Sequence, residues 1–464
     1  MTQRTISLTR PTPTHRSGSR ISVLEAITAI TIVAALLAVG ARAAGRLPNE
    51  RPAATSERPT RLIQMDGVWV DTATNPKRER FFWVLDPRTG AETGETLPFR
   101  LPENAYPRAF SADGRTLAYV DYHPSLTPPA ISVVDIVTGA VRRTLTYDQP
   151  TSVMRLNADG SRLILYRLSA GQRPPFTLLT VDVASGATLS TVTLQSTGDE
   201  WPTLTPDLRT AYLLNTHNTG SWPNITSGDV TLDLFDTTTG ARRIIPLPFV
   251  HAGVFPEDRT IRGEPVIRSF SPGIVASPDS TRLYIVHARM DAITVVNLKE
   301  GRVERTESIH PHVSAAQRLF GWLAPERVAA KEASESTDAQ ATIAPDGRTL
   351  AVTGTMVHPR DDDSDDVTDQ GVLFVDLRTF TETGHVLQQQ YQGYTRRLTV
   401  QWGADGRLLY IGNITSATTP DGSKDAYQLR VMDARSHAIT ATQTYMADSD
   451  APRYLRETWF ALPQ

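Results

Sequence analysis

Polar side chains recur along this sequence eight and ten positions after the aspartates of a repeated short pattern. They carry the carboxylate, imidazole, guanidinium and amide groups that bind polar ligands and carry out acid–base catalysis. If the elements that carry them are in register, these side chains form a ring around one opening; the alternative is that strand ends are simply where polar residues belong. The members of this candidate ring are Asp121, His123, Arg167, Asn215, His217, His287, Arg289 and Asn413.

A second candidate site is the acidic run that contains Asp361, Asp363 and Asp365. Hard cations such as Ca²⁺ prefer several carboxylates on a flexible loop, so the run is a candidate calcium site. It lacks the fixed glycine and the distal glutamate of an EF-hand loop, and a solvated loop is the alternative. No other part of the sequence requires a cofactor.

The composition excludes several classes of protein. The 464 residues include no cysteine, which rules out disulfides, thiolate metal sites and a cysteine nucleophile. The formal charge of -3 gives no basic field, so we expect no nucleic-acid partner. We find no Gly-x-Ser-x-Gly elbow, no His-Glu-x-x-His and no phosphate-binding loop, so no familiar catalytic signature indicates an enzyme.

The N-terminus reads as an export segment. Residues 1–20 form a basic leader without acidic residues, and residues 21–45 are mostly apolar and long enough for a membrane anchor. The small residues of Ala41-Arg42-Ala43 also permit cleavage as a signal peptide. The start of the apolar segment, Ile21 to Glu25, resembles a type IV prepilin, but Arg20 stands where that family has glycine.

Either interpretation places the rest of the chain outside the cytoplasm, held at the membrane by one span or secreted after cleavage. Residues 46–60 are rich in Pro, Arg, Glu, Ser and Thr and are typical of a solvated spacer.

One short pattern recurs along the rest of the chain and predicts hairpin turns. Its aspartate can bond the downstream backbone, the glycine that follows it in most copies accepts positive φ, and the alternating residues after the turn form a half-buried strand. The copies are Ser111–Tyr119, Asn157–Leu165, Thr205–Tyr212, Ser277–Ile285, Ala344–Val352 and Gly403–Ile411.

Each copy is followed by a β-rich run that ends in Asp or Asn and then in a Thr/Ser-Gly turn or its remnant. Seven such runs exist against six copies of the first pattern, and we place the missing copy, in degenerate form, at Met65-Asp66-Gly67. The runs are Val84–Gly90, Val133–Gly139, Val181–Gly186, Leu234–Gly240, Val295–Gly301, Val375–Thr379 and Val431–Ser436.

The spacing predicts an all-β, seven-bladed propeller with four-stranded antiparallel blades. The aspartates of the first pattern lie 46 to 72 residues apart, and one propeller blade needs about 40 to 45 residues. We expect the C-terminal strand near Tyr454–Ala461 to complete the first blade, so that the chain ends lock the ring. The expected blades within residues 61–464 are 61–101, 102–147, 148–196, 197–250, 251–309, 310–390 and 391–464.

These repeats resemble those of the YVTN, lactonase-like and TolB-like propeller families. The similarity rests on the Ser/Ala-Pro-Asp-Gly-Arg-x-Leu phrase and the Val-Asp-x-x-Thr-Gly run, and it covers roughly residues 61–464. The Gly-His and Trp-Asp signatures of true WD40 blades are missing. The resemblance implies a propeller and leaves the function open, because such folds host enzymes, receptors and scaffolds.

The extra length of the chain falls in the loops after the second and fourth strands, including insertions near 251–266 and 302–340. Loops carry function more often than scaffold strands, so we expect a binding surface on the face that bears them. The sequence therefore favours an extracytoplasmic binding module, as a monomer, for a protein, peptide or glycan. The alternatives are a lactonase-like or other hydrolytic propeller with its site at the channel mouth, and a scaffold of an envelope complex.

Overall fold

The computed structural model describes the repeat region and parts of its loops. Residues 1–59 lie outside the described residues, and they include the leader, the apolar segment and nearly all of the spacer. Among the residues that are described, no helix is long and apolar enough to cross a membrane. The described residues are 60–70, 77–102, 105–121, 129–168, 176–194, 202–220, 225–261, 264–311, 336–359, 365–387, 389–392, 398–419, 422–446 and 459–463.

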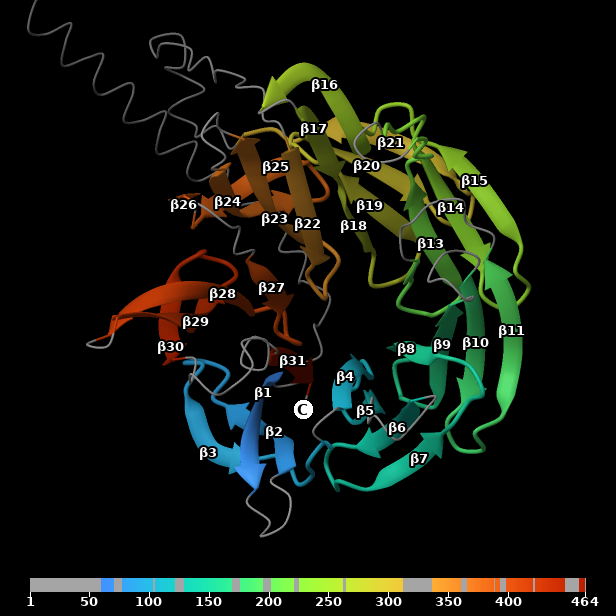
Figure 1. The fold of residues 1–464 in the computed structure, drawn as a ribbon, viewed down its shortest axis with the longest axis vertical. Coiled ribbons are helices and arrows are strands. Elements are labelled where there is room, and N and C mark those ends of the chain that lie inside the picture. Colours follow the sequence, from blue (N-terminus) through green and yellow to red (C-terminus); the bar gives the residue numbers. More distant parts are fainter. Residues whose placement is uncertain are drawn as a thin grey trace, which may run out of the picture. The chain divides into compact units, whose positions relative to one another are not determined.

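The described residues form an all-β, seven-bladed propeller within the compact unit Thr55–Gln464, which confirms the predicted fold (Figure 1). Each blade is built on four antiparallel strands in sequence order, except that the last strand of the chain is the first strand of blade one.

From the first strand to the fourth, blade one contains β31 (Trp459–Pro463), β1 (Thr60–Val70), β2 (Lys77–Leu85) and β3 (Glu92–Thr96). Blade two contains β4 (Ala105–Phe110), β5 (Thr116–Asp121), β6 (Ala130–Asp135) and β7 (Val141–Leu145). Blade three contains β8 (Thr151–Leu156), β9 (Arg162–Leu168), β10 (Phe176–Asp182) and β11 (Thr188–Leu194). Blade four contains β12 (Thr203–Leu204), β13 (Thr210–Asn215), β14 (Thr231–Asp236) and β15 (Arg242–Pro246).

Blade five contains β18 (Gly273–Ala276), β19 (Arg282–Val286), β20 (Ala292–Asn297) and β21 (Arg302–Ser308). Blade six contains β22 (Ser336–Ile343), β23 (Thr349–Pro359), β24 (Asp365–Asp376) and β25 (Thr381–Val386), and β26 (Gln389–Gln392) also pairs with β24. Blade seven contains β27 (Thr399–Trp402), β28 (Leu408–Thr419), β29 (Gly422–Asp433) and β30 (Ile439–Met446).

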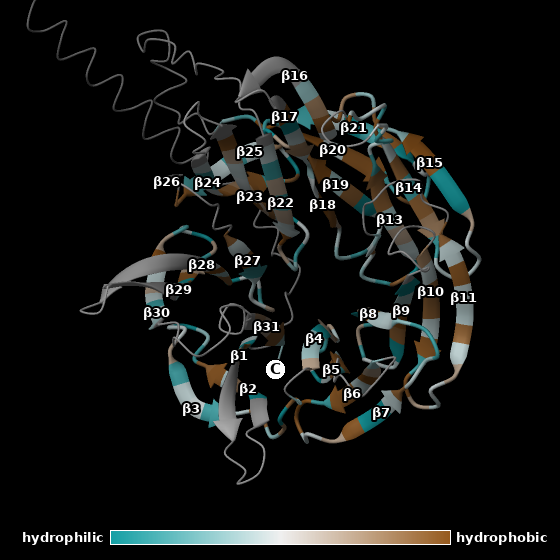
Figure 2. Ribbon diagram, in the orientation of Figure 1, coloured by the Kyte–Doolittle hydropathy of each residue, from teal (hydrophilic) through white to brown (hydrophobic). Residues whose placement is uncertain are grey.

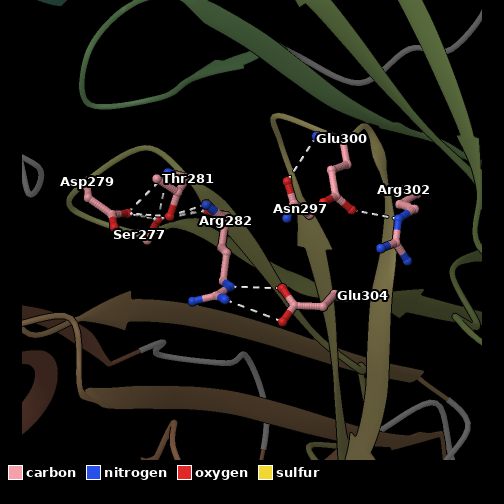
Figure 3. Close-up of polar contacts among 8 residues, drawn as sticks. All are labelled: Ser277, Asp279, Thr281, Arg282, Asn297, Glu300, Arg302 and Glu304. Carbon is pink, nitrogen blue, oxygen red and sulfur yellow. Dashed lines mark hydrogen bonds and ion pairs between the residues drawn. The ribbon is translucent and has the colours of Figure 1, made fainter.

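The repeated aspartates close the turns between the first and second strands, as the sequence predicts. In blade five, the Ser277 hydroxyl donates to Asp279 at 2.6 Å, and the Thr281 backbone N–H donates to the same carboxylate at 3.1 Å (Figure 3). Beside this turn Arg282 reaches Glu304 on β21, with Nε 2.9 Å from one carboxylate oxygen. The polar groups of the turn therefore bond to one another.

Among the described residues, seven apolar clusters hold the blades together, and each cluster joins two neighbouring sheets. Ile63 and Phe82 of blade one pack with Leu117 of blade two, and equivalent clusters follow around the ring. The last one joins Tyr410 of blade seven to Leu62 of blade one. Apolar residues gather on middle strands such as β19 and β20 (Figure 2). All five residues of the outer strand β3 are exposed.

The ring closes through β31, which pairs antiparallel with β1 from Thr60↔Pro463 to Gln64↔Trp459. Across the same seam, the Gln401 side chain accepts the backbone N–H of Ala461 at 3.1 Å. The Asp66-Gly67 pair lies inside β1 and forms no turn, because the first strand of blade one comes from the other end of the chain. No hairpin turn is needed there, which explains the missing copy of the first pattern.

One insertion, the hairpin of β16 (Gly253–Ile261) and β17 (Glu264–Ser271), lies between blades four and five. β17 continues almost directly into β18, yet its end pairs in parallel with β22 of blade six at Phe270↔Thr337. Gly273 allows this crossing, because a Cβ atom there would lie 3.1 Å from the backbone nitrogen of Ala341. The hairpin therefore links the first strands of blades five and six.

Candidate functional site

The two faces of the ring differ in how their connections are built. In antiparallel blades, the turns after first and third strands share one face, which we call the turn-bearing face. The connections after second and fourth strands share the other, the loop-bearing face, where the described insertion hairpin β16–β17 also begins. The candidate ring residues follow or end second strands, so they belong to the loop-bearing face.

The structure places most of the candidate ring residues in contacts within their own blades. Arg167 lies 3.4 Å from the Thr151 hydroxyl and 3.8 Å from the Asp148 carboxylate. The His217 ring lies 3.0 Å from the Thr231 hydroxyl. These contacts hold the beginnings of loops against the blade that carries them.

The two asparagines are also part of the scaffold. Asn215 is fully buried and accepts the backbone N–H of His217 at 3.0 Å. Asn413 is buried and accepts Arg430 Nη1 at 2.6 Å. Asn413 lies inside β28, which runs on to Thr419, and not at a strand end as the spacing predicts. Asp121 ends β5 opposite Ala130, and His123 lies outside the described residues.

His287 and Arg289 are different, because they line one cavity of about 320 Å³ on the loop-bearing face. The cavity lies where the loop between β19 and β20 meets the base of the β16–β17 hairpin. Its volume is at the small end of ligand-binding pockets, which span roughly 300 to 1,000 Å³. The lining residues are His251, Phe270, His287, Ala288, Arg289 and Asp291.

An aromatic cluster forms the hairpin side of this cavity. The ring of His251 stacks on Phe255, with centroids 4.4 Å apart and planes 12° apart, and meets Phe270 at 65°. The Arg289 guanidinium lies over Phe270 at 5.9 Å from the ring centroid. Phe270 is buried, while His251 and Arg289 are exposed. A buried ring therefore supports two exposed polar groups.

The opposite wall is a tight loop that fixes His287. The backbone N–H of His287 donates to the Ala292 carbonyl at 2.9 Å, and its own carbonyl accepts the Met290 N–H at 2.7 Å. Its Nε2 atom lies 2.9 Å from the Thr294 hydroxyl, which lies 2.9 Å from that of Thr306. The imidazole is thus held in one orientation by β20 and β21.

The charges around the cavity favour neutral imidazoles. Partial burial lowers the pKa of His251, and the charges of Arg289 and Arg268 lower this pKa further. Burial also lowers the pKa of His287, against the opposing effect of the Asp291 carboxylate. These shifts favour the uncharged form of both rings, in which each imidazole can donate one hydrogen bond and accept another.

Sequence reasoning found His287 and Arg289 and missed His251, Phe270, Ala288 and Asp291. The available signal was the insertion near 251–266, in which Gly263 separates two stretches rich in β-forming residues. What the sequence does not show is the pairing of β17 with β22, which fixes the base of the hairpin.

For the acidic run, Asp361 and Asp363 lie outside the described residues, and Asp365 begins β24 opposite Pro359. Within the described ranges, no group of three or more His, Cys, Asp or Glu side chains is placed to hold a metal ion. Calcium binding by the acidic run stays a prediction.

Comparison with known proteins adds no evidence on the family or the function of this chain. No protein-family model matches the chain, and no curated protein sequence matches it. A putative 6-phosphogluconolactonase from Bacteroides uniformis is 12% identical with a TM-score of 0.41, covering 87% of this chain and 99% of that chain. TolB from Acinetobacter baumannii is 12% identical with a TM-score of 0.35, covering 87% and 83%.

Hydrazine synthase of Kuenenia stuttgartiensis is 16% identical with a TM-score of 0.37, covering 70% of this chain and 75% of that chain. Likenesses at these identities and scores do not bear on function. Membership of the YVTN, lactonase-like or TolB-like families therefore stays a prediction from the repeats.

Proposed function

We propose that this protein is a binding module whose recognition site is the cavity lined by His251, His287 and Arg289. The observation that carries the proposal is the convergence of two separate elements, the β16–β17 hairpin and the loop after β19, on one cavity with an aromatic support. Recognition sites combine apolar support with a few well-placed polar groups on a rigid scaffold.

The cavity suits a small molecule or one end group of a larger partner, such as the protein, peptide or glycan expected from the sequence. The loops on the same face would then contact the rest of that partner. The sequence alternatives of a hydrolytic propeller and of an envelope scaffold stay predictions.

We also propose that the module works outside the cytoplasm, held at the membrane by residues 21–45 or released by cleavage. The support is the basic leader of residues 1–20 and the apolar segment that follows it. Fractionation of cells that produce the full chain or a chain without residues 1–45 tests this location. Recovery of the full chain in the cytosolic fraction would contradict it.

The recognition site is tested by a fragment screen. A mixture of small fluorinated fragments is added to the purified full chain, and binding is detected by ¹⁹F NMR line broadening. The site variant is His251→Ala with Arg289→Ala, since both side chains are exposed and lie in the cavity wall. The control is Phe249→Ala, which removes an exposed aromatic ring, 73% accessible, that does not line the cavity.

We expect fragments that bind the unaltered chain and the Phe249→Ala variant to lose at least tenfold in affinity for the double variant. If every fragment binds the double variant as well as the unaltered chain, the cavity is not the recognition site and the proposal fails.

A further inference from the structure

One exposed guanidinium in the cavity lined by His251, Phe270, His287, Arg289 and Asp291 points to an anionic ligand. Arg289 lines the cavity, is exposed, and forms no ion pair with any residue that the structure describes. Arg268 lies on β17 directly opposite Phe255, so it shares the hairpin face that carries Phe255 and Phe270. Arg268 does not itself line the cavity, so Arg289 is the one guanidinium and Asp291 the one carboxylate among the lining residues.

The ring geometry points to a flat group beside the charge. Phe255 covers one face of the His251 imidazole, so the exposed part of His251 that lines the cavity is its other face or its edge. The Phe270 ring contacts both the His251 ring and the Arg289 guanidinium. Aromatic rings prefer offset stacking or edge-to-face contact, so a flat ring of the ligand can pack against His251. A guanidinium presents its N–H groups in one plane, so the charged group of the ligand can lie beside that ring.

The hydrogen-bonding groups match one carboxylate. A guanidinium offers two parallel N–H donors to the two oxygens of a carboxylate. His287 is fixed through Nε2 on Thr294, and its imidazole reaches the cavity wall. The His287 imidazole and the aromatic support are held in place before a ligand arrives, which reduces the ordering cost of binding.

We propose that this cavity binds a small organic carboxylate that carries a flat ring, with the carboxylate on Arg289 and the ring against His251. This inference rests on the proposed function and names the chemical class of its ligand. The cavity volume of about 320 Å³ admits one such molecule.

Three fluorinated probes separate the contributions of charge and ring in ¹⁹F NMR titrations of the purified full chain. 4-Fluorobenzoate carries both features, 4-fluorobenzamide keeps the ring without the charge, and trifluoroacetate keeps the charge without the ring. We expect 4-fluorobenzoate to bind at least tenfold more tightly than either of the other two, because it alone combines a charge-assisted hydrogen bond to Arg289 with ring contact.

The variant Arg289→Gln should weaken 4-fluorobenzoate binding about tenfold and leave 4-fluorobenzamide unchanged. The matched control is Arg305→Gln, since Arg305 is also exposed and lies over a buried ring, Phe380, at 4.6 Å, but does not line the cavity. This control should bind 4-fluorobenzoate like the unaltered chain.

Equal affinity for 4-fluorobenzoate and 4-fluorobenzamide, or no effect of Arg289→Gln, would overturn the inference. If neutral fragments bind in the cavity and 4-fluorobenzoate does not, the carboxylate preference is wrong while the recognition role stands. If all fragments bind the double variant His251→Ala, Arg289→Ala as tightly as the unaltered chain, the proposed function itself is wrong.

Discussion

The aspartates of the two faces have opposite surroundings. On the turn-bearing face, Asp135 lies 2.5 Å from Arg142 and accepts the backbone N–H groups of Val137 and Thr138. Burial alone would raise its pKa, but these partners lower the pKa to about 2. The equivalent aspartates of other turns, such as Asp182 and Asp279, also have lowered pKa values because nearby hydroxyl groups donate to them.

Near the loop-bearing face, Asp369 of β24 is 3% exposed, and burial raises its pKa to about 6. The Gly371 backbone N–H donates to it at 2.8 Å, and the charge of Arg430 on β29 acts in the same direction, but together they only partly offset the desolvation. The turn-bearing face therefore stabilises the charged form of its aspartates, whereas the buried Asp369 is destabilised when its carboxylate is charged. Repeated turns serve the scaffold, and departures from the repeat carry the candidate site.

The largest effect is expected from Asp369→Asn. Because burial raises the pKa of Asp369 in the folded chain from 3.8 to about 6, its ionisation costs stability progressively between these two pH values and in full above them. Asparagine can still accept the Gly371 N–H, so the variant should be more stable than the unaltered chain at pH 8 by about 2 to 3 kcal/mol. Urea unfolding at pH 8 and pH 3 measures the difference, which should vanish at the lower pH because Asp369 is then protonated in both the folded and the unfolded chain. A variant that is less stable than the unaltered chain at pH 8 would show that the charged Asp369 carboxylate does not destabilise the fold.

The opposite sign is expected from Asp135→Asn on the turn-bearing face. Its lowered pKa means that the carboxylate stabilises the fold above about pH 4, and that this contribution is lost as the pH falls towards 2. The variant should lose about 1 to 2 kcal/mol at pH 7, allowing for solvent screening of a partly exposed ion pair. Urea unfolding at pH 7 checks this loss. An unchanged midpoint would show that the ion pair between Asp135 and Arg142 contributes nothing to stability. Binding of 4-fluorobenzoate should not change.

A smaller effect is expected from His287→Gln. The lowered pKa of His287 means that the unfolded chain binds a proton more readily, so this group costs stability as the pH falls below about 6.5. The difference in unfolding free energy between the variant and the unaltered chain should therefore shift in favour of the variant between pH 7.5 and pH 5.5. A difference that stays constant over this range would show that the ring is not desolvated.

The smallest effects on stability are expected from Arg289→Gln and Arg305→Gln. Each removes one exposed guanidinium that lies over a buried ring, so each should change the unfolding free energy by less than about 0.5 kcal/mol. Thermal unfolding of both variants checks this. A large loss for Arg289→Gln alone would mean that Arg289 supports the scaffold, and its loss of ligand affinity would then need another explanation.

The fold was accessible from the sequence because its signals are local. An aspartate, its hydroxyl partner and the following glycine specify a turn within a few residues, as at Ser111, Asp113 and Gly114. Two copies without glycine still form the turn, with Leu208 and Ser280 at φ values of 62° and 57°. Here the packing of the blades imposes a conformation that local preference disfavours.

The candidate site was accessible only in part, because it depends on contacts distant in sequence. Counting from the aspartates finds His287 and Arg289, but the same count also selects Asn215 and Asn413, which are buried scaffold residues. What separates the two groups is the β16–β17 hairpin, whose position follows from pairing between Phe270 and Thr337. A parallel pairing across such a distance leaves no periodic signal in the sequence.

Hydrogen–deuterium exchange with and without a bound fragment tests whether recognition occurs on the loop-bearing face. We expect a fragment found by the ¹⁹F screen to slow exchange in peptides that cover 251–271 and 287–292 of this face. Exchange in the turns at 111–116 and 277–282 should stay the same. Protection confined to the turns, with none at 251–271, would contradict the assignment of recognition to the loop-bearing face.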